Sequence, residues 1–274
     1  MKKHFSTIIL VLILVIGLSL LLYPTVADWW NSFHQSQAIA HYESVMANMS
    51  DEDYEHLFEE AMEYNEKIRQ IDFPLMYHDR VEGYFDMLAV VPSGVMGYIS
   101  IPKIGVQLPI YHGTSDGVLQ VAVGHVQGSS LPTGGESTHT VLSAHRGLPS
   151  ARLFTDLDQM EVGDTFVLSV IDRTLTYQVE EIMIVLPHET ERLSVVEGED
   201  YCTLTTCTPY GINSHRLLVR GTRVENAKEQ KIIRVTSDAS IIEPILVAPF
   251  VAAPILLVLF IGLMIPKPQK RREE

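Results

Sequence analysis

The second half of the chain is divided into short runs of β-forming residues, with glycine and proline between them. The runs cover residues 95–101, 106–111, 119–125, 139–143, 165–171, 175–186, 201–207 and 216–224. Eight short strands at this spacing predict a mainly β fold that closes into a barrel. One helix is expected between the fourth and fifth strands, over residues 151–160, because Leu153, Phe154 and Leu157 share one helical face.

Both ends of the chain are apolar over a length that can cross a membrane. Residues 5–23 follow Lys2 and Lys3, and residues 245–265 precede a basic tail. Basic residues stay on the cytoplasmic side, so we expect two spans, two cytoplasmic termini and an exterior domain between them. The first span is interpreted as an uncleaved signal anchor, and a cleaved secretory signal is the alternative.

These patterns divide the chain into five segments. Residues 1–27 are the N-terminal anchor, and residues 28–92 are a helical spacer with a candidate lid region. Residues 93–226 form the β-barrel, residues 227–243 a linker, and residues 244–274 a transmembrane helix with its cytoplasmic tail. Within the spacer, Ser50 and the acids after it predict a helix start, so two helices should break near residues 48–50.

The chain has a net charge of −14. The basic residues at the two termini belong to the membrane anchors, so the exterior domain between them is more acidic still. This balance argues against a nucleic-acid partner, which requires a basic surface. No paired acids or CxxC motif point to a bound metal, and we expect neither a metal nor a cofactor.

One of the two cysteines lies in a predicted hairpin. The β-rich run that ends at Cys207 is followed by a turn containing Pro209, Gly211 and Asn213, and then by a strand that begins near Arg216. This places a thiol beside a fixed cation, which favours the nucleophilic thiolate. A small buried hydrophobe is the alternative interpretation of a strand cysteine.

A disulfide between Cys202 and Cys207 is excluded by geometry. Five extended residues span about 17 Å, whereas bridged Cα atoms lie within about 7 Å of each other. The odd separation also points the two side chains to opposite faces of the strand.

A nucleophilic cysteine requires a proton-transfer partner. Among the eleven histidines, His145 is the best candidate because it lies where a strand enters a loop rich in glycine and proline. His125 has a similar position, and the sequence ranks it only slightly lower. His215 should face away from the site, because it alternates with Arg216.

The hairpin resembles the signature of the sortase family, in which a TLxTC strand ends in the catalytic cysteine and an arginine follows on the next strand. The match rests on TLTTC at residues 203–207, HRGLPS at 145–150, GYISIPKI at 97–104 and GHVQGSSLP at 124–132. It covers residues 90–224. The CTPYGIN form of the turn and the second span are similar to the pilin-polymerising class C.

The resemblance implies an eight-stranded sortase barrel and a cysteine transpeptidase. Cys207 would attack the Thr–Gly bond of an LPXTG-like sorting signal, and a lysine amine of a second pilin subunit would resolve the thioester. His145 would transfer protons, and Arg216 would bind the substrate backbone and stabilise the oxyanion. Thr206 and Leu186 are candidate substrate contacts.

Pilin sortases often carry a lid with an Asp-Pro-aromatic motif. Here Asp72 and Phe73 precede Pro74, so the three residue types occur in a different order. Asp72 and Phe73 are therefore candidate lid residues, and an ordinary loop at a helix end is the alternative.

Three other functions remain open at this point. A housekeeping-type sortase would anchor surface proteins to cell-wall peptide, and a cysteine hydrolase would use water as its acceptor. A membrane-tethered adhesin would not need Cys207 at all.

Overall fold

The computed structural model describes residues 2–226, which fall into two compact units. The first unit includes residues 2–26, and the second begins at Ala27 and contains the rest of the described chain. The predicted C-terminal membrane helix, within residues 244–274, lies outside the described residues.

Helix α1 (Lys2–Met46) is one uninterrupted helix of 45 residues. The sequence predicted a membrane anchor over residues 1–27 and a helical spacer from residue 28, and the structure joins the two in one helix. Within residues 2–226, α1 is the one helix long and apolar enough to cross a membrane. This supports the predicted N-terminal membrane segment.

The predicted break near residues 48–50 is confirmed. Helix α2 (Asp51–Arg69) begins after Ser50, whose hydroxyl accepts the backbone N–H of Asp53 while the Asp53 carboxylate accepts the backbone N–H of Ser50. Its buried side chains recur every three or four residues, so one face of α2 packs against the barrel. Asn65 on this face donates to the carbonyl of Leu131 and accepts its N–H.

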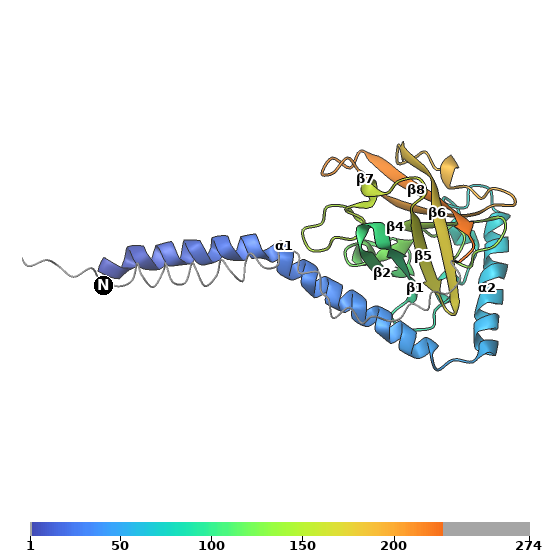
Figure 1. The fold of residues 1–274 in the computed structure, drawn as a ribbon, viewed down its shortest axis with the longest axis horizontal. Helices are drawn as coiled ribbons and strands as arrows, with labels where there is room; N and C mark the ends of the chain where they lie inside the picture. Colours follow the sequence, from blue (N-terminus) through green and yellow to red (C-terminus); the bar gives the residue numbers. More distant parts are fainter. Residues whose placement is uncertain (1, 227–274) are drawn as a thin grey trace, which may run out of the picture. The chain divides into compact units, whose positions relative to one another are not determined.

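Eight strands form a closed barrel, as the sequence predicted (Figure 1). Their order around the barrel is β1-β2-β3-β4-β7-β8-β6-β5, and only the β2/β3 and β4/β7 pairs are parallel. The strands are β1 (Val95–Ile101), β2 (Val106–His112), β3 (Val123–His125), β4 (Thr138–Ser143), β5 (Thr165–Val170), β6 (Arg173–Val185), β7 (Asp200–Thr208) and β8 (His215–Val224).

The helix predicted over residues 151–160 is wrong. The segment forms turns and one short 3-10 helix, Leu157–Gln159. Leu153 has a left-handed φ of 41°, and the N–H of Phe154 bonds to the carbonyl of His145 instead of that of Ser150. The three apolar residues that suggested a helix are still buried in the core without one; they are Leu153, Phe154 and Leu157.

The third strand also begins later than predicted, at Val123 instead of residue 119. A short helix, α3 (Asp116–Leu119), occupies the start of the expected strand, and the hydroxyl of Ser115 caps it by accepting the N–H of Val118.

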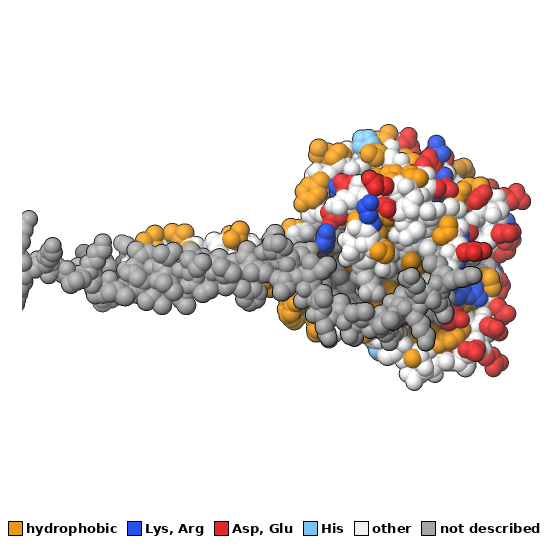
Figure 2. Space-filling model, in the orientation of Figure 1, with side chains coloured by type: hydrophobic (Ala, Val, Ile, Leu, Met, Phe, Trp, Pro, Cys, Tyr) orange, Lys and Arg blue, Asp and Glu red, His pale blue; other side chains and the backbone are white. Residues whose placement is uncertain are grey.

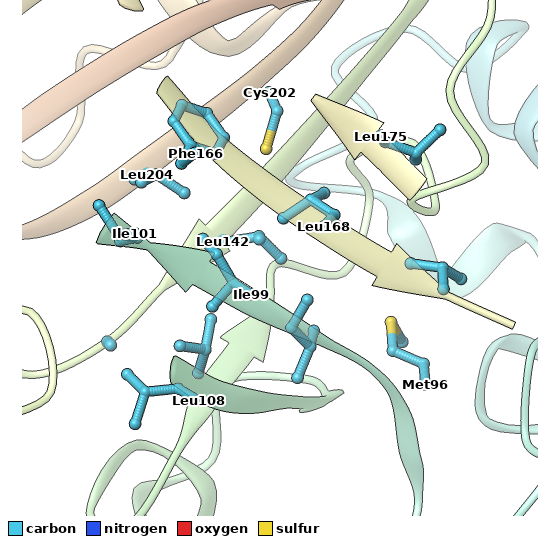
Figure 3. Packing of buried hydrophobic residues seen from close by; sticks show 14 of the residues in the cluster. Met96, Ile99, Ile101, Leu108, Leu142, Phe166, Leu168, Leu175, Cys202 and Leu204 are labelled. Carbon is cyan, nitrogen blue, oxygen red and sulfur yellow. The ribbon is translucent and has the colours of Figure 1, made fainter. Parts of the chain in front are cut away.

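The barrel interior is a single apolar core that includes one of the two cysteines. Figure 3 shows Cys202 beside Phe166 and Leu204 in this core, and all three side chains are fully buried. Gly221 on β8 allows the Phe166 ring to approach, since a Cβ at this position would lie 2.8 Å from the ring. In the second unit, acidic side chains gather along the edge where α2 lies (Figures 1 and 2).

Candidate active site

Strands β7 and β8 bring a thiol and a guanidinium together. Cys207 is the penultimate residue of β7, Arg216 is the second residue of β8, and the two are direct partners in the antiparallel register. Direct partners on neighbouring strands point to the same face of a sheet, with Cβ atoms about 5 Å apart. The predicted hairpin geometry is therefore confirmed.

This face is the outer face of the barrel. Cys202 and Leu204 alternate with Cys207 along β7, and both lie in the core. Cys207 therefore points outward and is partly exposed, whereas Cys202 is buried. Both cysteines are free, as the excluded disulfide required.

The two thiols differ in chemistry because of this alternation. Burial, and to a lesser extent the nearby Asp200 carboxylate, raises the pKa of the Cys202 thiol well above its usual value. Cys202 therefore stays protonated and enclosed, and Cys207 is the thiol that a peptide can reach.

Strand β4 brings His145 to the same end of the site. It runs parallel to β7, with Ser143 opposite Thr205, and the N–H of Ala144 donates to the carbonyl of Thr205. Continuing this register by two residues places His145 opposite Cys207. Ala144 lies in the core, so alternation directs His145 to the outer face.

The Arg216 side chain is held by the backbone of the β7/β8 loop. Its Nη1 donates to the carbonyl of Asn213 at 3.3 Å and to that of His215 at 3.1 Å. Asn213 has a left-handed φ of 60°, which turns the chain back toward the guanidinium. Among residues 2–226 no carboxylate pairs with Arg216, so its charge is available to a ligand.

His125, the second candidate for the proton-transfer residue, has a structural role. His125 is fully buried, with Nδ1 2.9 Å from the Tyr84 hydroxyl and Nε2 2.9 Å from the carbonyl of Ser130. Burial lowers the pKa of His125 to about 4, so it is neutral at physiological pH. Its side chain lies inside the fold and away from the face that carries Cys207.

Comparison with known proteins identifies the family. A family model described as "Sortase domain" matches residues 99–224. The crystal structure of sortase C1 from Streptococcus agalactiae is 50% identical, with a TM-score of 0.66, and the match covers 70% of this chain and 100% of that one. This chain belongs to the sortase family.

Other relatives agree with this assignment. The solved sortase C of Streptococcus pneumoniae is 42% identical with a TM-score of 0.63, over 70% of this chain and 99% of that one. Sortase D of Bacillus subtilis (strain 168) is 32% identical over 131 residues, which are 47% of this chain. Sortase A of Streptococcus agalactiae (serotype III, strain NEM316) is 31% identical over 117 residues, or 42% of this chain. The matches span 63% and 47% of these two curated relatives.

Sortases are cysteine transpeptidases, so the chain is an enzyme of this class, and the solved relatives named above are sortases of class C.

The two candidate substrate contacts, Thr206 and Leu186, lie in different surroundings. Thr206 is only 2% exposed, and its hydroxyl donates to the carbonyl of Ala144 at 2.8 Å. Its buried side chain thus connects β7 to the end of β4, and its predicted substrate contact stays a prediction. Leu186 is exposed directly after β6, where its N–H donates to the Glu189 carboxylate.

Of the two candidate lid residues, Phe73 lines a pocket of about 510 Å³, whereas Asp72 is not among its lining residues. Phe73 lines it together with Gly128 and His139, and the Phe73 side chain is 74% exposed. His139 lies on β4, six positions before His145, which corresponds to about 20 Å of extended chain. Of the described residues, those that line this pocket do not include Cys207, so the lid function stays a prediction.

Sequence reasoning missed a connection between α1 and the loop after His145. The Asn31 side chain donates to the carbonyl of Ser150 at 2.8 Å, and the Asp28 carboxylate accepts the N–H of Arg152 at 2.8 Å. Polar residues on a helix carry no signal of such distant partners. These two contacts hold the backbone at residues 150–152, where the loop that begins at His145 ends.

Within residues 2–226 no group of three His, Cys, Asp or Glu side chains is placed to hold a metal ion. Cys207, His145 and Arg216 are therefore the candidates for a nucleophile, a proton-transfer group and a cation.

Proposed function

We propose that this sortase assembles covalent pili by joining the LPXTG-like sorting signal of one pilin subunit to a lysine of another. The observation that carries the proposal is the similarity to sortase C1, which extends over 100% of that chain at 50% identity. A second solved relative, the sortase C of Streptococcus pneumoniae, is described in terms of its pilin substrate specificity.

In the first half-reaction, the Cys207 sulfur attacks the carbonyl carbon of threonine in the Thr–Gly bond. The C–N bond breaks as the C–S bond of a thioester forms, and His145 donates its proton to the departing glycine amine. The outward orientation of Cys207, beside the extended register of His145, supports these roles.

In the second half-reaction, the neutral ε-amine of a pilin lysine attacks the thioester and gives its proton to His145. An isopeptide bond forms, and the Cys207 thiolate leaves. Arg216 stabilises the oxyanion that develops in each step, since its guanidinium stays charged and is held by the carbonyls of Asn213 and His215. Removing one such donor costs about 3 kcal/mol of transition-state stabilisation.

We further propose that the catalytic domain lies outside the membrane with both termini in the cytoplasm. The apolar first helix and the basic residues near both ends support this topology. A membrane-impermeant thiol reagent should therefore label Cys207 in intact cells. Labelling that requires cell lysis would contradict the topology.

A housekeeping-type sortase is the second candidate, because the curated relatives include two proteins named sortase A. The two functions differ in their products. The test is to express the full chain in cells with a pilin that bears an LPXTG-like signal and an acceptor lysine. Ladders of linked pilin that disappear in Cys207→Ala support polymerisation.

Three controls make the test specific. The Cys202→Ala variant should retain the ladders, and replacing the acceptor lysine of the pilin should abolish them. A single wall-linked product would favour the housekeeping function. Cleaved but unlinked pilin would favour a hydrolase.

A further inference from the structure

Arg146 follows His145 in the sequence, and Thr208 follows Cys207. The two side chains meet: Nη1 of Arg146 donates to the Thr208 hydroxyl at 3.3 Å. Arg146 Nη2 also pairs with the Asp158 carboxylate, which belongs to the short 3-10 helix at the return of the loop after His145. One guanidinium therefore joins the loop of the histidine to the strand of the cysteine.

A second hydrogen bond connects the residues that precede Cys207 and His145. Thr206 precedes Cys207, and its hydroxyl donates to the carbonyl of Ala144, which precedes His145. The residues before and after Cys207 are thus each hydrogen-bonded to the residue before or after His145. Thr206 and Thr208 alternate with Cys207 along β7, so both bonds lie on the opposite face and leave the thiol free.

The β4/β7 ladder explains why such side-chain bonds are needed. The paired residues end at Ser143 and Thr205, two positions before His145 and Cys207. Beyond this point the N–H of Ala144 still donates to the carbonyl of Thr205, and side-chain contacts then add to the connection between the two chain segments. The Thr206–Ala144 and Arg146–Thr208 bonds continue the connection past the end of the ladder.

The burial of Arg146 points to positioning more than to stability. Its side chain is 11% exposed, while that of Asp158 is 49% exposed. Nε of Arg146 is buried without a hydrogen-bond partner among the described residues. A buried ion pair with an unsatisfied donor contributes little net stability, because desolvation offsets the attraction.

The adjoining loops also pack closely at this point. A Cβ at Gly147 would lie 2.5 Å from the Tyr210 ring, so glycine lets the β7/β8 loop approach the loop after His145. Gly147 has a left-handed φ of 76°, which glycine adopts without strain.

We propose that Arg146 and Thr208 are positioning residues that set the distance between His145 and Cys207. Their effect on the reaction passes through these two groups, and neither side chain contacts the substrate. The proposal rests on the function proposed above, since it requires a measurable cleavage reaction.

The test compares Thr208→Val with Thr208→Ser in the full chain, using a fluorogenic LPXTG-like peptide. Valine keeps the shape of threonine and removes the acceptor, whereas serine keeps the hydroxyl. We expect Thr208→Val to lower kcat about tenfold with KM unchanged, and Thr208→Ser to restore most of the loss. A kcat for Thr208→Val equal to that of the wild type would overturn the proposal.

A double-mutant cycle with Arg146→Gln adds a second test. If one bond carries the effect, the Arg146→Gln/Thr208→Val variant loses no more kcat than Arg146→Gln alone. Additive losses would contradict the proposal. Asp158→Asn provides a further variant at a half-exposed position, and it should lower kcat without changing the melting temperature of the domain. A loss of stability with unchanged kcat would show that the ion pair is only structural.

The wild-type enzyme separates this proposal from the proposed function. If the wild type cleaves none of the LPXTG-like peptides, the proposed function fails. If it cleaves them and Thr208→Val cleaves equally well, only the positioning proposal fails.

Discussion

Two buried histidines should make this sortase sensitive to mild acid. His125 bonds to Tyr84 and Ser130 inside the fold, and His139 bonds to the carbonyl of Ser194 and the hydroxyl of Thr203. Burial is the main cause that lowers the pKa of each histidine from 6.5 to about 4. The native state therefore keeps both rings neutral at a pH where the unfolded chain protonates them.

The sign and size of the effect follow from linkage. In acid the unfolded state binds more protons than the native state. The contribution of the two neutral histidines to the free energy of unfolding is therefore fully present above pH 6.5, and it is lost as the pH decreases toward 4. Between pH 7 and 5 each histidine should reduce the free energy of unfolding by about 2 kcal/mol, and the two together by about 4 kcal/mol. Ordinary carboxyl groups titrate lower and contribute little in this window.

Urea unfolding of the full chain in detergent micelles, followed by circular dichroism, measures this dependence. His139→Gln should be less stable than the wild type at pH 7, but its loss between pH 7 and 5 should be about half as large. His188→Gln serves as the matched control, because His188 is exposed and its variant should keep the wild-type pH dependence. A wild-type stability that is equal at pH 7 and 5, or an unchanged slope in His139→Gln, would refute the reasoning.

Three further predictions concern the stability of the barrel, the activity of the enzyme and the accessibility of Cys207. Gly221→Ala should destabilise the fold by about 1–3 kcal/mol in the same unfolding assay, because its Cβ would meet the Phe166 ring. Asn31→Ala should lower kcat/KM by up to about fivefold, since it removes one bond to the loop that begins at His145, the proposed proton-transfer residue. Gln35→Ala, which breaks a comparable bond from α1 to Val121, should leave kcat/KM unchanged. Equal losses in the two variants would contradict the role of Asn31 in holding this loop. Deleting residues 71–76 should leave alkylation of Cys207 unchanged, and faster alkylation would establish a lid.

The sequence predicted the barrel well because its signals are local. Every expected strand is present, and the alternation along β7 correctly separated Cys202 in the core from Cys207 outside it. The pairing of Cys207 with Arg216 followed from a short turn with residues suited to positive φ.

The errors arise where tertiary contacts replace local preferences. Residues 151–160 have a helical apolar pattern, but Asp28 and Asn31 of α1 bind the backbone of Arg152 and Ser150 and hold the segment in turns. The order of His125 and His145 could not be decided from loop position alone. The structure distinguishes the two by burial, because His125 is enclosed in the fold with the distant Tyr84 beside it.

The position of the acyl intermediate tests the central claim most directly. The full-length enzyme is incubated with an LPXTG-like peptide without an amine acceptor, quenched in acid, digested and analysed by mass spectrometry. We predict a thioester adduct on the peptide that contains Cys207, which persists in Cys202→Ala and is absent from Cys207→Ala. An adduct on Cys202, or cleavage that survives Cys207→Ala, would contradict the assignment of Cys207 as the nucleophile.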